Sequence, residues 1–183
     1  QTQIAESQNH SSDDGLKLSA KYFQQASGIF NHLKDRVLSA VQSDPTPDLH
    51  PDTLAALGSL MLAQAQDCFV SKAMADKMKP AIVAKLSHQC SDLYADAMKL
   101  LQLDSIRGLW PRDWIPCVAG KQAAFHSLAE YYQSFLAKDQ KEFGEEISRL
   151  RHAKSLMAAA ENRGGHMFKY QDLQKKIYRG LEE

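Results

Sequence analysis

The chain has 183 residues, of which 44% are hydrophobic and 24% are charged, a composition typical of a globular protein that can bury a sizeable core. Basic and acidic residues are equal in number at 22 each, which argues against a general attraction to nucleic acid or to an anionic membrane. No apolar stretch approaches the roughly 20 residues that span a bilayer, and the first residues lack the blocks of a secretory signal. We therefore expect a cytosolic chain, in which Cys68, Cys90 and Cys117 are reduced thiols.

A polar segment, residues 1–12, opens the sequence, and we expect it to form a flexible lead-in to the first helix. Ser11, Ser12 or Asp13 can cap that helix, because side-chain oxygens accept hydrogen bonds from the unpaired backbone N–H groups of a first turn. The spacing of apolar residues predicts a helix that extends to about Val41. Its predicted apolar stripe is Tyr22, Ala26, Ile29, Leu33, Val37 and Val41.

A proline-rich run then predicts a turn, and Pro51 suits the first position of the next helix. That helix carries Leu54, Leu57, Met61, Ala65 and Cys68 on one side. Pro80 lacks a backbone N–H and predicts a break between Ala73 and Lys79, after which a third helix runs to about Leu101. The centre of its predicted apolar face is Val83, Cys90, Tyr94, Ala97 and Leu101, and its flank is Ile82, Leu86, Leu93 and Leu100. Its predicted polar side is Lys85, His88, Asp92, Asp96 and Lys99.

The second half of the chain predicts three more helices. Pro111 and Pro116 bound a connection, and the following helix reaches about Gln140. Its apolar positions are Val118, Phe125, Leu128, Tyr132 and Phe135. The next helix is marked by Phe143, Ile147, Leu150, Ala153 and Met157, and a glycine pair at 164 and 165 can end it. A last short helix is predicted from Tyr170, Leu173, Ile177 and Leu181. Short connections between such helices predict an all-α fold with antiparallel neighbours, either in a bundle or in an array of helical hairpins.

The sequence holds no constellation of residues that predicts catalysis, a metal or a cofactor. Its seven histidines include no pair four residues apart, as a helical metal site would need, and a Gly-rich phosphate loop is absent. The acidic pairs at 13–14 and 145–146 fall at predicted helix starts, where the helix dipole favours negative charge. We interpret Trp110 and Trp114 as hydrophobic packing at a helix entry rather than as a binding platform. These observations argue against an enzyme.

Several long blocks resemble the Bro-domain family: LMLAQAQDCF at 60–69, DKMKPAIVAKL at 76–86, EYYQSFLAKDQK at 130–141 and FGEEISRLRHA at 143–153. The resemblance covers nearly the whole chain from about Ile4. It implies that residues 13–183 form tetratricopeptide-like helical hairpins from the central and later part of a Bro domain. Pro80 departs from the family pattern, which has an acidic residue at this place.

The resemblance also implies a function. Members of the family are adaptors that bind the amphipathic C-terminal helix of an ESCRT-III subunit, the charged multivesicular body protein of class four, in multivesicular body sorting, membrane scission and virus budding. They are cytoplasmic proteins recruited to endosomes. Positions that match the family's contact residues are Asp13, Lys17, Phe69, Lys72, Ile82 and Leu86. Spacing alone favours a core position for Ile82 and Leu86, and the resemblance reverses that interpretation.

Three alternatives remain open from the sequence. Lys77, Lys79 and Lys85 suggest a membrane-binding module that meets anionic endosomal lipid, although the neutral charge balance argues against strong binding. A related Bro protein would dock a different peptide on the same helices. A domain without its neighbouring segments would expose apolar surface and associate with itself.

Overall fold

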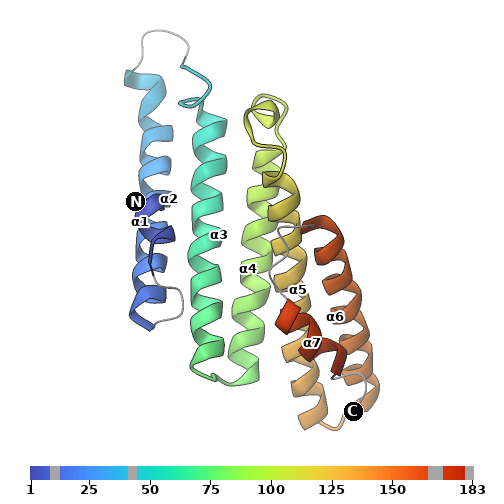
Figure 1. The fold of residues 1–183 in the computed structure, drawn as a ribbon. Coiled ribbons are helices and arrows are strands. Elements are labelled where there is room, and N and C mark those ends of the chain that lie inside the picture. The colour runs from blue at the N-terminus through green and yellow to red at the C-terminus, as the bar shows by residue number, and fades with distance from the viewer. Residues whose placement is uncertain (9–12, 41–44, 165–170, 180–183) are drawn as a thin grey trace. The chain divides into compact units, whose positions relative to one another are not determined.

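The computed structural model describes residues 1–8, 13–40, 45–164 and 171–179. Within these ranges the regular structure consists of α-helices and one short 3-10 helix, which confirms the predicted all-α class (Figure 1). The residues group into two compact units. The first unit contains Gln1–Lys72 and Leu93–Ile115, and the second contains Ala73–Asp92 and Pro116–Glu183.

The first unit is built from α1 (Thr2–Glu6), α2 (Asp13–Ala40), most of α3 (Pro51–Ala75) and the end of α4 (Pro80–Leu101), followed by the 3-10 helix η1 (Arg107–Leu109). A Cβ atom added at Gly58 of α3 would lie only 3.2 Å from Oδ1 of Asn31 in α2, so the missing side chain allows these helices to approach closely. The hydroxyl of Tyr94 in α4 donates a 3.1 Å hydrogen bond to the Asp67 carboxylate in α3. These contacts place α3 between α2 and the end of α4.

Helix α1 lies within the segment expected to be a flexible lead-in, and the sequence pattern did not predict it. Ala5 is completely buried, and its carbonyl accepts a 2.8 Å hydrogen bond from the Ser19 hydroxyl in α2. The hydroxyl of Thr2 lies 3.4 Å from the sulfur of Met61 in α3. A helix of this length is marginal alone, so such tertiary contacts explain why local sequence did not reveal it.

Helix α2 was predicted with nearly correct bounds, but the predicted buried stripe was partly wrong. Ala26 is buried, whereas Ile29 and Leu33 are exposed. The buried side chains lie on a neighbouring face that includes small polar residues, namely Leu16, Ser19, Ala20, Phe23, Ala26 and Ser27. The prediction followed the larger apolar side chains, while the closely packed face is rich in small ones. The side chains of Val37 and Val41 lie outside the described residues.

The prolines set the helix starts as predicted, because Pro51 begins α3 and Pro80 begins α4. The chain turns between them with Lys77 in the left-handed region, at a φ of 51°. All the residues predicted at the centre of the α4 face are buried, and those predicted on its polar side are exposed. The hydrophobic pattern of α4 was therefore interpreted correctly.

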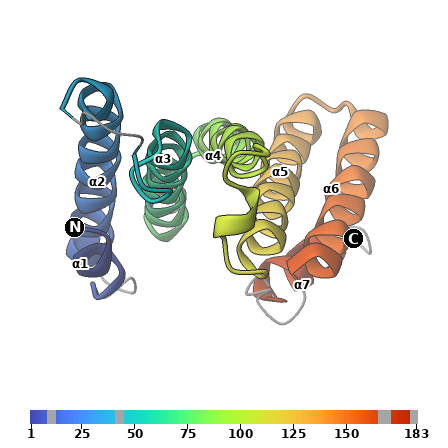
Figure 2. The ribbon, with the colours of Figure 1, turned by 90° about the horizontal axis from the view of Figure 1, so that it is seen from above.

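The second unit contains the start of α4, nearly all of α5 (Trp114–Asp139), α6 (Phe143–Gly164) and α7 (Gln171–Arg179). Helices α5 and α6 lie side by side in both views (Figures 1 and 2). Their cluster of buried residues also includes a residue of α7, and its members are Ala123, Ala124, Ala153, Met157, Ala160 and Ile177. The Ser127 hydroxyl donates a 2.6 Å hydrogen bond to the Ala153 carbonyl, and Ser91 of α4 bonds to Gln122 of α5. Small side chains thus allow α5 and α6 to pack closely together, and Ile177 of α7 packs against this pair.

Two further expectations for this half of the chain need correction. Helix α5 begins at Trp114 rather than after Pro116, because a proline is tolerated in the first turn, where the backbone N–H groups have no partner within the helix. Phe143 and Ile147 were predicted on the apolar stripe of α6 but are exposed, and only Leu150, Ala153 and Met157 of that stripe are buried. The helix ends at Gly164, as predicted.

Candidate functional site

In the second unit, the first turns of α4 expose the apolar pair that the sequence singled out. The Ile82 side chain is 44% exposed and Leu86 is half-buried, while Val83 and Ala84 between them are buried. Residues four apart on a helix lie on the same face. The start of α4 therefore buries one face in the protein and leaves Ile82 and Leu86 on the flank that meets solvent.

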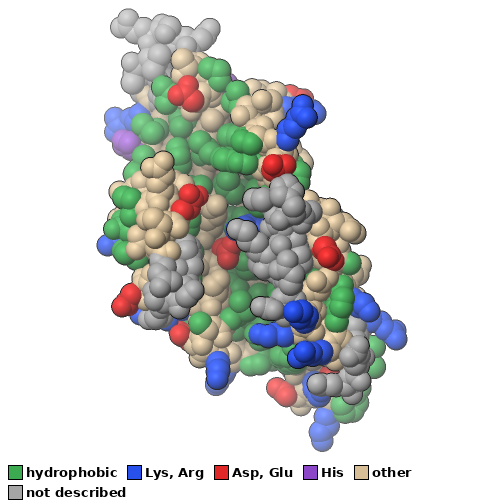
Figure 3. Space-filling model, in the orientation of Figure 1, with side chains coloured by type: hydrophobic (Ala, Val, Ile, Leu, Met, Phe, Trp, Pro, Cys, Tyr) green, Lys and Arg blue, Asp and Glu red, His purple; other side chains and the backbone are tan. Residues whose placement is uncertain are grey.

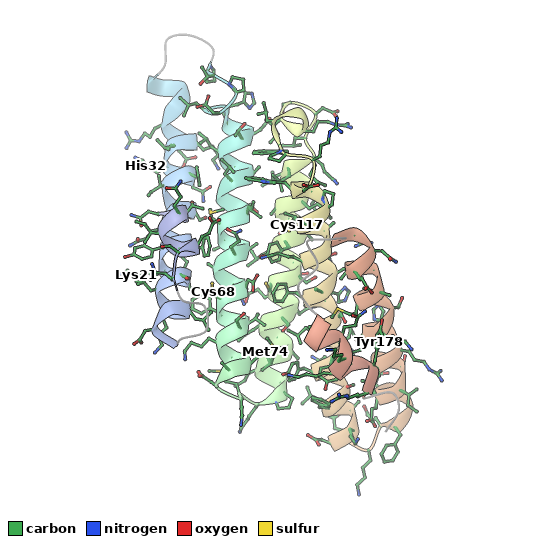
Figure 4. All side chains as sticks on the ribbon, in the orientation of Figure 1. Lys21, His32, Cys68, Met74, Cys117 and Tyr178 are labelled. Carbon is green, nitrogen blue, oxygen red and sulfur yellow. The ribbon has the colours of Figure 1, made fainter. Side chains whose placement is uncertain are left out.

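Two exposed methionines shortly before this pair in the sequence were not predicted as part of the site. Met74 at the end of α3 and Met78 in the turn are both exposed (Figure 4 labels Met74). Met78 precedes Ile82 by four residues, and the exposed Lys77 and Lys79 flank it. Methionine side chains are flexible and polarizable, and they suit surfaces that bind apolar partners. The only signal in the sequence was the position of these methionines beside the helix break.

In the first unit, Phe69 and Lys72 lie one turn apart on α3. The Phe69 ring is 38% exposed and Lys72 is half-buried, whereas the neighbouring Cys68 and Val70 are buried. Leu62, two turns before Phe69 on the same face, is also exposed and was not predicted as part of the site. Helix α3 thus exposes two apolar side chains on one face, with the cation of Lys72 one turn beyond Phe69.

The remaining two predicted residues lie at the start of α2, also in the first unit. Lys17 is exposed on the second turn of that helix. Asp13 is the first residue of α2, and its side chain lies outside the described part of the structure. The structure therefore brings together Phe69 with Lys72, and separately Ile82 with Leu86, within their own units.

A row of three histidines in the second unit was not foreseen. The ring centroids of His88 in α4 and His126 in α5 are 6.0 Å apart, and those of His126 and His152 in α6 are 5.5 Å apart. Glu130 Oε1 lies 3.9 Å from a ring nitrogen of both His126 and His152. Because one residue comes from each of three helices, no spacing in the sequence could have indicated this row.

Burial and neighbouring charges act on the central histidine in opposite directions. Burial lowers the pKa of His126, the Glu130 carboxylate raises it, His152 and His88 lower it, and Asp92 raises it, with a net lowering below 6.5. Glu130 also forms an ion pair with Arg149, in which Oε2 of Glu130 lies 2.9 Å from Nη1 of Arg149. His126 is therefore mainly neutral at pH 7.

The histidine row is not arranged as a metal centre. Among the described residues, no group of three or more His, Cys, Asp or Glu side chains is placed to hold a metal ion. Cys68 and Cys90 are buried free thiols, and Cys117 is a half-buried one. None of the described helices combines the length and hydrophobicity that crossing a bilayer needs. The described surface exposes the apolar side chains of Phe69 and Ile82 and many charged groups.

Known proteins are similar to this chain both in sequence and in the arrangement of their helices. A family model described as a BRO1-like domain matches residues 1–183. Programmed cell death 6-interacting protein of Mus musculus is 47% identical over 180 residues, which are 98% of this chain and 20% of that protein. The chain therefore spans about a fifth of the length of this curated relative.

Two solved structures are similar to the chain. A crystal structure of ALIX in complex with the SIVmac239 PYKEVTEDL late domain matches with a TM-score of 0.94 and 45% identity, over 99% of this chain and 26% of that one. An ALIX BRO1–CHMP4C complex matches with a TM-score of 0.93 and 46% identity, over 98% of this chain and 50% of that one. The chain belongs to the BRO1-like domain family, and the resemblance predicted from its sequence is confirmed.

Proposed function

We propose that this chain is a non-catalytic adaptor that binds the amphipathic C-terminal helix of an ESCRT-III filament subunit. The observation that carries the proposal is the exposure of Ile82 next to Val83 and Ala84, which are buried. An amphipathic helix recognises its receptor by placing apolar residues, spaced three and four apart, against such exposed apolar side chains. The similar ALIX BRO1 structure is a complex with CHMP4C, which supports the same class of partner for this chain.

The proposed contacts divide into apolar and polar roles. Phe69, Ile82 and Leu86 receive the apolar face of the partner helix, because each keeps part of its apolar surface in water when the partner is absent. Lys17 and Lys72 bind carboxylates on the partner, and Asp13 binds a cation. This adaptor acts in the cytoplasm, is recruited to endosomes, and links cargo or virus budding sites to membrane scission.

The replacement Ile82→Asp tests the proposal against a matched control, Ile147→Asp. Both isoleucines lie in helices of the second unit, and their exposed fractions are 44% and 46%. Burying an unpaired carboxylate against an apolar partner costs at least about 2 kcal/mol, or roughly 30-fold in affinity. We expect calorimetry with the ESCRT-III peptide to show this loss for Ile82→Asp only, with helix content unchanged in both variants. Unchanged affinity for Ile82→Asp would sink the assignment.

The first unit has its own test. Phe69→Asp should weaken binding of the same peptide as strongly as Ile82→Asp does. Ile29 is an exposed apolar residue on α2 outside the proposed contacts, so Ile29→Asp should leave the affinity within about twofold of that of the unchanged protein. Equal losses for both variants would show a general effect on the fold rather than a contact.

A membrane-binding function is a second candidate, favoured by the exposed Met74 and Met78 beside Lys77 and Lys79. Apolar side chains next to cations can enter the interface of an anionic membrane. Sedimentation with vesicles containing phosphatidylserine separates the two functions. If Lys77→Glu combined with Lys79→Glu abolishes sedimentation while peptide affinity is unchanged, the surface also binds lipid. Absence of sedimentation by the unchanged protein excludes this candidate.

A further inference from the structure

A small pocket opens in the second unit between α5, α6 and α7. Its volume is about 240 Å³, which is smaller than the roughly 300–1,000 Å³ of pockets for drug-sized ligands. Apolar side chains form part of its wall, namely Tyr131, Phe135 and Leu150. The rings of Tyr131 and Phe135 meet edge to face with centroids 4.8 Å apart, which fixes this wall.

The remaining wall of the pocket is positively charged. Lys138, Lys176 and Arg179 line it together with a single carboxylate, Glu146. The Glu146 side chain is only 15% exposed and holds the Lys138 ammonium at 3.4 Å. Three cations and one carboxylate leave two positive charges around the pocket. Figure 3 shows Lys and Arg side chains gathered on the part of the surface that the C-terminal helices form.

Helix α7, which carries two of these cations, is anchored to the rest of the second unit. Ile177 is completely buried in the cluster with α5 and α6. The Lys154 ammonium lies over the ring of the next residue, Tyr178 (labelled in Figure 4), 5.0 Å from the ring centroid. Lys176 and Arg179 are three residues apart and so lie on one face of the helix. The anchored helix therefore presents a lysine and an arginine to the same small space.

We propose that this pocket binds a phosphate monoester carried by a small organic group. A phosphate monoester carries about −1.5 to −2 charges at neutral pH, which matches the two positive charges of the wall, whereas a carboxylate or a phosphodiester carries one. Arginine donates paired hydrogen bonds to phosphate oxygens, and lysine adds a second charge. The organic part packs on Phe135 and Leu150. The same chemistry occurs in soluble metabolites and in the headgroup of phosphatidic acid.

The first experiment uses phenyl phosphate as the probe and phenyl sulfate, which has one charge, as its control. In ¹H–¹⁵N spectra of the chain, titration with phenyl phosphate should shift the amides of Lys138, Leu150 and Lys176. The variant Lys176→Gln/Arg179→Gln should bind at least about tenfold more weakly, since hydrogen bonds to charged groups are lost. Lys175→Gln removes a charge from the same helix outside the pocket, and its affinity should stay within about twofold.

These outcomes distinguish a specific binding site from nonspecific electrostatic attraction. Equal binding of phosphate and sulfate, or an equal loss in Lys175→Gln, would overturn the proposal. A vesicle arm identifies the source of the phosphate by comparing phosphatidic acid with phosphatidylserine at the same mole fraction. Selective binding to phosphatidic acid that disappears in Lys176→Gln/Arg179→Gln supports the lipid headgroup. Binding of the soluble probe without vesicle selectivity supports a free metabolite, and absence of both refutes the site.

Discussion

Two glycines inside helices should respond in opposite ways to the same replacement by alanine. Gly28 in α2 is exposed, and a Cβ atom added there would have no heavy atom within 4 Å. A glycine in a helix interior costs about 1 kcal/mol relative to alanine, so Gly28→Ala should stabilise the protein by about that amount. Gly120 in α5 is buried, and its Cβ would lie 3.1 Å from Cα and N of Gly164 and 3.2 Å from the Ala160 carbonyl oxygen.

The contacts at Gly120 are with backbone atoms of the last turn of α6, which cannot rotate away as a side chain would. Overpacking of this kind costs about 1–3 kcal/mol, which exceeds the gain of about 1 kcal/mol in helix propensity. We therefore expect Gly120→Ala to destabilise the protein by about 1 kcal/mol, so that the two variants differ by about 2 kcal/mol. With a urea dependence of about 1–3 kcal/mol per molar, their unfolding midpoints should differ by about 1 M. A midpoint for Gly120→Ala as high as that of Gly28→Ala would refute the close approach of α5 and α6.

The buried hydroxyls and the histidine row allow further tests. Ser87 is completely buried and its Oγ has no hydrogen-bond partner among the described residues, so Ser87→Ala should raise the free energy of unfolding by about 1 kcal/mol. Ser127→Ala, which removes the bond to the Ala153 carbonyl, should lower it by a similar amount, and calorimetric Tm values that move in the same direction would contradict this pair. The lowered pKa of His126 means that the folded state binds its proton less readily than the unfolded chain. The part of the free energy of unfolding that depends on neutral His126 should be fully present above pH 6.5. It should be lost as the pH drops through the lowered folded-state pKa of His126. His126→Gln should reduce this loss in acid unfolding curves, and an unchanged pH profile would show that the row is not responsible.

Helix positions could be predicted from the sequence where a single residue decides them. Pro51 and Pro80 begin helices because a proline fits a first turn and breaks a helix interior. The centre of the α4 face was also predicted, since its apolar residues and its charged residues fall on opposite sides. In contrast, α1 depends on the bond between Ser19 and Ala5, which only the folded chain brings together. Local periodicity carries no information about such a contact.

The candidate site shows the same division. The flank position of Ile82 follows from the α4 pattern, but whether a flank is exposed depends on what packs beside it, and spacing alone favoured burial. Its exposure was expected only through the resemblance to the Bro-domain family. Met74, Met78 and the histidine row were missed, because their surroundings come from a turn and from three separate helices. The pocket was missed for a similar reason, since it needs the placement of α7 by Ile177.

Helices α3 and α4 each contribute residues to both compact units. The division at Lys72 and Ala73 falls inside α3, and the division at Asp92 and Leu93 falls inside α4. A third division, at Ile115 and Pro116, falls in the first turn of α5. Neither unit can be expressed by itself without cutting α3, α4 and α5 and leaving their severed turns without backbone partners. Recombination between relatives would therefore exchange the two units together, and shortened versions of the chain should keep these three helices whole.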